Sequence, residues 1–409
     1  MSAHTLPAPV QKAQHPLRNR AFRLLWIGET VSWTGDQFYL VALPWLVLSL
    51  TGSSIVLGTI AMLAAIPRAA LMLLGGALSD RASPRRILMI TAFARALLVT
   101  AVAVLLFFKN LHLWELYFLA FGFGVADALS YPAGAALLPF VVEPAQLPAA
   151  NSISQSTLQC AMLVAPGPAG LFIRAFGSAW AFLLDGISFL AILAALIRLP
   201  DPPGPGTGAP RIGMLQAIAD GLRYVRADVS LRSLVLLITV LNFAIAGPMT
   251  IGLAVIAKRE FGTASAFGFL VSSFAAGSLG GMLCAGLLPQ RRRGRTVLLA
   301  GSILGFCVVA TGFLSRIGTL APDLLLMSGI VAFLNVQVIV WLQQRVERAL
   351  IGRVMSVLMF ASVGLTPLSL ALAGVALKAS LSGTFICAGV MVLLFTLLAA
   401  SRRAVRAID

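Results

Sequence analysis

The stretch Ile87–Phe108, ILMITAFARALLVTAVAVLLFF, is apolar almost throughout and contains one charged residue, Arg95. It has the length that an α-helix needs to cross a hydrocarbon core of about 30 Å. Its apolar residues do not alternate with polar ones, as they would in the strands of a membrane barrel. Since lipid offers no hydrogen bonds to the backbone, the stretch predicts a transmembrane α-helix.

Similar apolar runs recur along the 409-residue chain, of which 59% is hydrophobic and 11% is charged. A soluble domain carries about 25% charged residues, so we expect lipid to cover much of this surface. The sequence predicts an all-α membrane protein. Twelve transmembrane helices are expected near residues 24–50, 54–78, 87–108, 114–139, 151–173, 179–198, 233–257, 266–289, 296–315, 322–341, 354–377 and 383–401.

The longest polar stretch between predicted helices, residues 199–232, divides the chain into two halves. It begins with the Pro- and Gly-rich residues 200–206, and it ends in an expected amphipathic surface helix over residues 218–232. We therefore predict an N-terminal six-helix bundle, residues 1–198, and a C-terminal six-helix bundle, residues 233–409.

The net charge of +16 is explained by the membrane rather than by nucleic acid. Lys and Arg are concentrated in the segments expected on the same side as the N-terminus. By the positive-inside rule, this predicts a multi-pass protein of the bacterial cytoplasmic membrane with both termini cytoplasmic. No patch of interleaved aromatic and basic residues favours nucleic acid. The four cysteines lie in apolar runs without metal-ligand spacing, so we expect no metal and no cofactor besides a proton gradient.

The segment before the opening stretch, residues 76–86, reads GALSDRASPRR. It resembles the signature loop of the major facilitator superfamily, Gly-x-Leu-x-Asp-Arg-x-Gly-Arg-Arg, although Ser83 and Pro84 depart from that pattern. A related Gly-x-Leu-x-x-Arg pattern at residues 286–291 favours duplicated halves. The resemblance implies two pseudo-symmetric six-helix bundles and a loop that latches them together. The alternative is a loop that only sets orientation. The loop residues concerned are Gly76, Asp80, Arg81, Arg85 and Arg86.

Further segments are similar to the branch of this superfamily that contains macrolide-type drug exporters and the enterobactin exporter. The resemblance covers nearly the whole chain and implies a monomeric secondary transporter rather than an enzyme. It rests on residues 19–26, 35–36, 42–44, 131–133, 136–139, 150–152, 221–225 and 352–356.

The predicted fifth span contains the run APGPAG at residues 165–170, which looks like a degenerate Gly-Pro motif of the family's antiporters. Proline bends a membrane helix and small residues allow close packing, so a plain kink and an antiporter element both remain open. The motif residues are Pro166, Gly167, Pro168 and Gly170.

Three charged residues fall near the predicted bilayer midplane: Asp36, Arg68 and Asp127. In the family architecture the first and fourth spans line the central cavity, so the resemblance implies that both acids face substrate. We expect Arg68 to pair with one of them. A charge is costly at this depth, so each carboxyl can pick up and release a proton. The alternative is a closed structural ion pair.

Other charges inside the predicted spans are given smaller roles. Glu29 lies closer to the cytoplasmic end of the first span and could belong to a gate. Arg95 and Asp185 lie on helices that are peripheral in the family, so a structural role is expected. Asp323 and Glu115 fall at the outer ends of spans, where we expect them to be hydrated.

The second half has no acid at the midplane, and its polar candidates are amides. Amides can orient a ligand but cannot carry a proton, so this half is expected to supply an apolar wall. The residues expected at the substrate cavity are Asn242, Phe243, Asn335 and Gln337.

These observations predict a proton-coupled exporter of amphipathic small molecules, including cationic ones, that works by alternating access in contact with membrane lipids. An alternative with the same fold is a transporter of lipid (lysophospholipid) or siderophore, in which Arg68 and Arg95 would bind an anionic cargo. A membrane enzyme or sensor is the remote alternative, because no metal cluster or Ser/His/Asp grouping lies at membrane depth.

Overall fold

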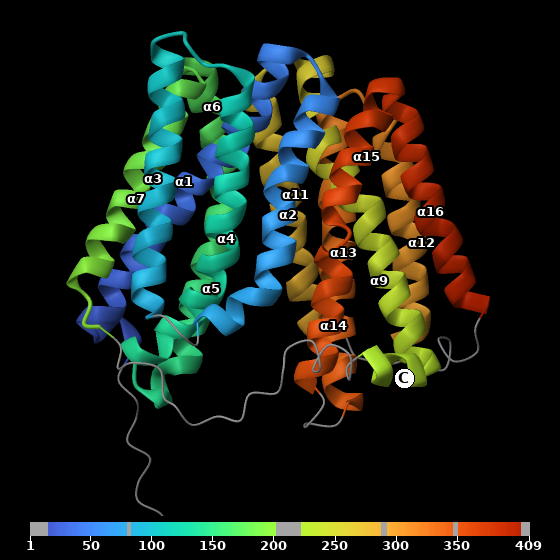
Figure 1. The fold of residues 1–409 in the computed structure, drawn as a ribbon. Coiled ribbons are helices and arrows are strands. Elements are labelled where there is room, and N and C mark those ends of the chain that lie inside the picture. Colours follow the sequence, from blue (N-terminus) through green and yellow to red (C-terminus); the bar gives the residue numbers. More distant parts are fainter. Residues whose placement is uncertain (1–14, 80–82, 202–221, 288–292, 347–350, 402–409) are drawn as a thin grey trace, which may run out of the picture.

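The computed structural model describes residues 15–79, 83–201, 222–287, 293–346 and 351–401, and its regular structure there is entirely helical. Figure 1 shows the helices standing side by side. In the first half they are η1 (Pro16–Arg18), α1 (Arg20–Thr51), α2 (Ser54–Ser79), α3 (Pro84–Phe107), α4 (Leu113–Val141), η2 (Pro144–Gln146), α5 (Leu147–Val164), α6 (Pro166–Phe176) and α7 (Ser178–Arg198). In the second half they are α9 (Val229–Gly247), η3 (Pro248–Gly252), α10 (Leu253–Ile256), η4 (Ala257–Phe261), α11 (Ala264–Leu287), α12 (Arg293–Thr311), α13 (Ile317–Arg345), α14 (Ile351–Val363), α15 (Thr366–Ala379) and α16 (Leu381–Ser401).

The prediction of an all-α membrane protein is confirmed. Ten helical segments of the described chain are long and apolar enough to cross a membrane, and α5 with α6 makes an eleventh when the bent pair is counted as one span. Helix α1 is longer than any of these, but it contains Glu29, Asp36 and Gln37. Its count as the twelfth span stays a prediction.

Two expected spans differ from simple helices. The predicted fifth span bends by 42° between α5 and α6, at Ala165. Pro166 explains the break, because proline has no N–H to continue the hydrogen bonds of α5 and its ring crowds the preceding turn. The predicted seventh span continues through two π-helical turns, η3 and η4, on either side of α10. Such turns frequently occur at functional sites within helices.

The helices of the first half pack mainly among themselves, with α1 along α7, α3 against α4 and α7, and α2 against α4. In the second half, α11 packs on α13, and α12 packs on α13 and α16. The predicted boundary lies largely in residues 202–221, outside the described residues. Residues 222–227, within the expected amphipathic segment, are helical.

Small residues bring the two halves together at the end of the bundle where α1 gives way to α2. Helix α2 packs on α15, where Ser54 Oγ donates to the carbonyl oxygen of Gly374 at 2.8 Å. A Cβ added at Gly58 would lie 2.9 Å from Gly374 Cα. Without side chains at these two positions, the backbones approach closely.

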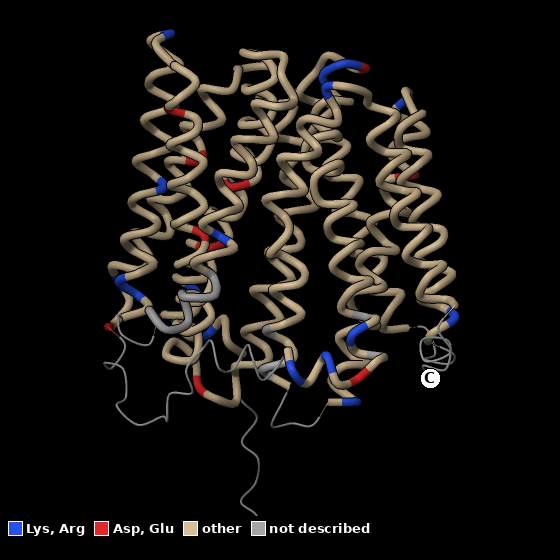
Figure 2. The backbone as a smooth tube through the Cα atoms, turned by 45° about the vertical axis from the view of Figure 1, so that its right-hand side comes forward, with Lys and Arg blue, Asp and Glu red and all other residues tan. Residues whose placement is uncertain are grey.

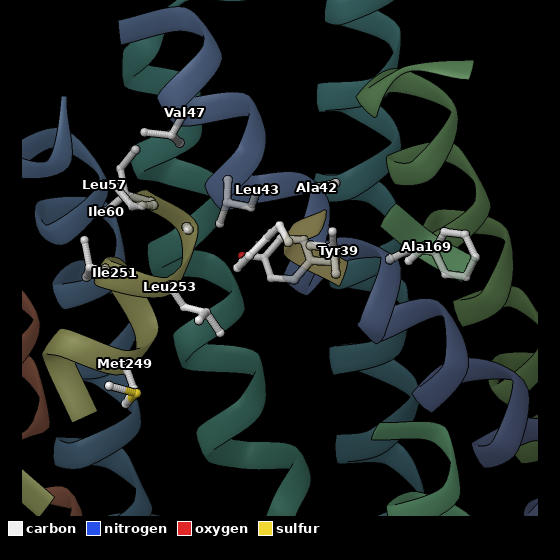
Figure 3. Packing of buried hydrophobic residues seen from close by; sticks show 14 of the residues in the cluster. Tyr39, Ala42, Leu43, Val47, Leu57, Ile60, Ala169, Met249, Ile251 and Leu253 are labelled. Carbon is white, nitrogen blue, oxygen red and sulfur yellow. The ribbon is translucent and has the colours of Figure 1, made fainter. Parts of the chain in front are cut away.

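The hydrophobic core is shared between the halves. One continuous cluster of buried side chains contains residues from α1 and α2 together with residues from η3 and α10. Figure 3 shows part of it, with Leu43 on α1, Leu57 on α2 and Leu253 on α10 in the same region.

Candidate functional site

An ion pair within the spans joins Arg95 on α3 to Asp127 on α4. Arg95 Nη2 lies 2.7 Å from Asp127 Oδ1 and donates to Ser130 Oγ at 3.0 Å. The Arg95 side chain is 11% exposed, and that of Asp127 is 39% exposed. The expected pairing with Arg68 is therefore wrong for Asp127. The Arg68 side chain is exposed, and no described carboxylate forms an ion pair with it.

Aromatic rings enclose the arginine from two helices. The guanidinium carbon of Arg95 lies 5.8 Å from the ring centroid of Phe123 on α4 and 5.6 Å from that of Phe189 on α7. Phe123 is one turn before Asp127, and Phe189 is one turn after Asp185. The rings limit access of water to the cation and attract its charge, which strengthens its interaction with a carboxylate.

Asp185 on α7 is fully buried beside α1. Ser188 Oγ lies 2.7 Å from the backbone oxygen of Asp185 and 3.3 Å from its Oδ1. A Cβ at Gly35 on α1 would meet the Ser188 side chain and would lie 2.9 Å from Asp185 Oδ1. Glycine at position 35 therefore lets α1 approach this carboxyl group.

Asp36 adds a third carboxyl group to the cluster. It is half-buried on α1, and it interacts electrostatically with Arg95, Asp127 and Asp185. Arg95 and Asp185, for which a structural role was expected, therefore lie in one cluster with Asp36 and Asp127. Their common signal in the sequence was a charged residue inside an apolar run.

Glu29 lies seven residues before Asp36, two turns along α1, and is half-buried. Residues at this spacing share a helix face, so Glu29 and Asp36 face the same side of α1. Three residues after Asp36, the Tyr39 ring stacks on that of Phe123, with centroids 4.2 Å apart and an interplanar angle of 11°. Buried aromatic rings therefore form one side of the cluster.

An apolar cavity of about 440 Å³ is lined by residues of both halves. Asn242 and Asn335 line it, whereas the other two residues expected there, Phe243 and Gln337, do not. Leu40 and Pro44 of α1 also line it. The remaining lining residues come from the second half: Leu237, Ile238, Leu241, Ile245, Ala246, Met249, Thr250, Leu253, Phe267, Val271, Phe274, Val297, Gly301, Leu304, Val331, Leu334, Val338 and Thr396.

Helix geometry connects the cavity to the charged cluster. Asp36 precedes the lining residue Leu40 by four residues on α1, so the two are neighbours on one helix face. No charged residue is among those that line the cavity. A ligand could thus place an apolar body in the cavity and a polar end toward Asp36.

The predicted signature loop is described only in part. Asp80 and Arg81 lie outside the described residues, and Gly76 is placed only as part of the helix α2. Arg85 contacts the C-terminal end of α7: its guanidinium donates to the carbonyl oxygens of Leu196 at 2.6 Å and Ile197 at 3.0 Å.

Arg85 also pairs with Asp201 just beyond that helix, with Nη1 2.7 Å from Oδ1. A cation at this position satisfies the carbonyl groups that a helix leaves without partners at its end. The neighbouring Arg86 is exposed.

The Gly/Pro motif of the predicted fifth span lies against α11. The backbone N–H of Gly167 donates to Ser272 Oγ at 3.0 Å, and a Cβ at Gly170 would lie 3.0 Å from Ser265 Cα. Pro166 begins α6, and Pro168 is exposed. The motif therefore combines a bend with a close contact between the halves.

Asp323, which was expected to be hydrated at a helix end, is instead partly buried and hydrogen-bonded. It is half-buried and accepts a hydrogen bond from Thr311 Oγ1 at 2.7 Å, and it also interacts with the Cys307 thiol. Glu115 is also largely covered, since its side chain is 13% exposed and accepts a hydrogen bond from the backbone N–H of His112 at 2.7 Å, in a cap at the start of α4. Among the described residues, no group of three His, Cys, Asp or Glu could hold a metal ion.

Comparisons with known proteins agree over nearly the whole chain. The family model described as "Transmembrane secretion effector" matches residues 11–409. The chain is 26% identical over 399 residues to the multidrug efflux pump Tap of Mycolicibacterium fortuitum, which covers 94% of this chain and 96% of Tap. It is 25% identical to macrolide efflux protein A of Streptococcus pyogenes, covering 73% of this chain and 74% of that protein.

The enterobactin exporter EntS of Shigella boydii serotype 4 (strain Sb227) is 23% identical, covering 82% of this chain and 80% of EntS. Among solved structures, a mutant of the nucleoside transporter NupG superposes with a TM-score of 0.75 at 12% identity. That match covers 93% of this chain and 98% of the NupG chain. At this identity the likeness concerns the fold alone.

Proposed function

This chain belongs to the transmembrane secretion effector family of major facilitator superfamily transporters, as its motifs predict, and we propose that it exports amphipathic small molecules by proton-coupled alternating access. Its relatives named above are efflux proteins and exporters, which favours outward transport. The chain is thus a transporter and not an enzyme.

The position of the apolar cavity beside Asp36 carries this proposal. The cavity volume of about 440 Å³ suits a small organic molecule, and its lining offers amides but no charge. The carboxyl groups of the cluster provide the charged region that the cavity lining lacks. A molecule with an apolar body and a basic group would satisfy both regions at once.

Proton coupling is assigned to Asp36 and Asp127, with Glu29 on the same face of α1. Asp127 is the more accessible partner of the Arg95 ion pair, so a proton or a cationic ligand can compete for it. Because a charge is costly within the membrane, protonation and substrate binding exclude each other at such a group. Protons entering down their gradient would then drive the substrate out.

We place the protein in the bacterial cytoplasmic membrane with both termini in the cytoplasm. In Figure 2, many Lys and Arg residues lie at the end of the bundle where α1 begins, which supports this orientation. Residues 1–198 and 233–409 would move as two bundles about the substrate, with the loop at residues 76–86 as a latch on the cytoplasmic side.

Transport by purified protein in liposomes tests the proposal. A thermal-shift screen with a macrolide, ethidium and enterobactin selects a probe, whose transport is then measured with and without an imposed pH gradient. We expect Asp36→Asn and Asp127→Asn each to reduce gradient-driven transport. Asp323→Asn is the matched control, since it removes a carboxylate of the second half. Full gradient-driven activity in both test variants would contradict the assignment.

A second candidate substrate class is anionic, such as a siderophore or lysophospholipid. It is favoured by the exposed Arg68 side chain, which has no carboxylate partner among the described residues. Under this alternative, Arg68→Glu would abolish transport of enterobactin. Under the cationic proposal, the same variant would leave transport of a macrolide or ethidium in place.

A further inference from the structure

Two buried polar atoms of the charged cluster have no hydrogen-bond partner. They are Nε of Arg95, a donor, and Oδ2 of Asp185, an acceptor. Unpaired buried groups are uncommon because each loses its contact with water without compensation. A donor and an acceptor left unpaired in one cluster indicate that a second arrangement could join them.

The surroundings of Arg95 offer such an arrangement. On α4, Phe123 and Asp127 are one turn apart, and on α7 Asp185 and Phe189 are one turn apart. Arg95 lies at a similar distance from both rings and is bonded to the carboxylate of α4. It also interacts electrostatically with the carboxyl of α7. Each helix therefore presents an acid and a ring to the same guanidinium.

We propose that Arg95 is a two-position counter-ion that pairs with Asp127 in this state and with Asp185 in another, so that the carboxyl without the arginine holds a proton of the transport cycle. The idea rests on the proposed proton coupling and deepens it. Arg95 is in this view a positioning residue, and Asp185 is a further proton-exchanging group on α7.

The charges around Arg95 explain why its exchange of partners would move a proton. One cation between two acids allows only one of them to stay ionised at low cost, because an unpaired buried charge is strongly unfavourable. When Asp127, whose side chain is 39% exposed, takes up a proton, one O–H bond forms there and the guanidinium turns to Asp185. The O–H bond of Asp185 then breaks.

The proton released by Asp185 goes to Asp36 on α1, which is the neighbouring carboxyl. The summed charge of the cluster rises by one with each proton that Asp127 takes up, and it returns to its starting value when Asp36 releases that proton. Besides Asp36, the groups that face these acids are Tyr39 on α1, Arg95 on α3 and Asp127 on α4.

A double-mutant cycle on the full chain in detergent tests the exchange without any substrate. Asp127→Asn and Asp185→Asn each leave Arg95 one acid, whereas the double variant leaves it neither. We expect each single variant to lower the unfolding temperature slightly and the double variant to lower it by more than the sum. The control pair, Asp127→Asn with Asp323→Asn, should be additive. Additivity within the cluster would overturn the proposal.

Infrared spectroscopy of the protein in lipid provides a readout that a structural role alone would not change. A carboxylic acid C=O band that is absent in Asp185→Asn reports the proton on Asp185. We expect this band in the wild type and its loss in Asp127→Asn, where Arg95 is free to pair with Asp185. An unchanged band in Asp127→Asn, or no such band in the wild type, would overturn the proposal.

The two proposals fail in different ways. If an imposed pH gradient does not change transport by the wild type, the proposed proton coupling is wrong. The double-mutant cycle and the infrared C=O band still show whether Arg95 can pair with either acid. If transport is gradient-driven but Asp185→Asn keeps the wild-type pH profile, the coupling stands and the role of Asp185 does not. Arg95→Lys keeps the cation and should retain part of the gradient-driven transport, whereas Arg95→Gln should lose it.

Discussion

The ammonium group of Lys258 lies 4.2 Å from the ring centroid of Trp45 and donates to Ser49 Oγ at 2.9 Å. Trp45 and Ser49 are one turn apart on α1, and Lys258 lies in the π-helical turn η4. This contact joins the first half to the second at the end of the bundle where α1 gives way to α2. It has to break if the halves separate there.

We expect Lys258→Met to favour separation of the halves at this end. A cation–π contact is worth about 0.5–1 kcal/mol at an accessible site, so the separated population should rise roughly two- to fivefold. Spin labels at Leu50→Cys and Glu260→Cys, in a variant with the native cysteines replaced, would report it as a longer distance by pulsed electron resonance. Arg259→Met, in the same turn, is the control. An equal shift in both variants would contradict the expectation.

The close contact between α6 and α11 should be intolerant of a single methyl group. A Cβ at Gly268 would meet the carbonyl oxygen of Pro166 and lie 3.0 Å from Gly170 Cα. We expect Gly268→Ala to destabilise the protein by about 1–3 kcal/mol, the usual cost of overpacking. The matched control is Gly280→Ala on the same helix, since a Cβ there meets nothing within 4 Å.

The control should keep its stability or gain slightly, because alanine favours helices over glycine by about 1 kcal/mol. Thermal unfolding in detergent, followed by intrinsic fluorescence, measures both variants. Equal unfolding temperatures for Gly268→Ala and Gly280→Ala would show that the two helices can move apart without loss.

The sequence was sufficient to predict the membrane helices, because the thickness and apolar interior of a membrane set the length and composition of the segments that cross it. It also placed Asp36 and Asp127 correctly within helices, since position along a helix follows from counting residues. It was not sufficient for the partner of Asp127, because the direction in which a side chain points depends on helix rotation and tilt. Arg68 and Arg95 both lie within predicted spans, and only packing shows that Arg95 is the one that reaches Asp127.

The same limit explains the cavity. Asn242 and Asn335 line it, whereas Gln337, two residues after Asn335 on α13, is buried away from it with an unpaired Oε1. Two residues correspond to about 200° around a helix, so neighbouring polar residues face opposite sides. Composition identified the polar candidates, but packing decided which of them reach the cavity.

Arg85 should contribute to stability and not only to membrane orientation. Its side chain is 15% exposed and donates to two carbonyl oxygens at the end of α7. We expect Arg85→Ala to lower the free energy of unfolding by about 1.5–3 kcal/mol, the range of hydrogen bonds that involve a charged group. Arg86→Ala, at the exposed neighbour, should have little effect. Thermal unfolding of both variants at low and high salt is the measurement, and identical behaviour would contradict the assigned contact.

Asn242 should bind the polar group of a ligand inside the cavity. Its Nδ2 donates to the carbonyl oxygen of Ile238 at 3.0 Å, which fixes the amide and leaves its oxygen as an acceptor. We expect Asn242→Leu to weaken binding of the probe found by thermal shift roughly five- to tenfold, the equivalent of one hydrogen bond of about 1–1.4 kcal/mol. Phe243→Leu, at the next position of α9 but outside the cavity lining, is the control. Titration of the purified variants gives both dissociation constants. Equal affinities would mean that the ligand does not use this amide and binds through the apolar wall alone.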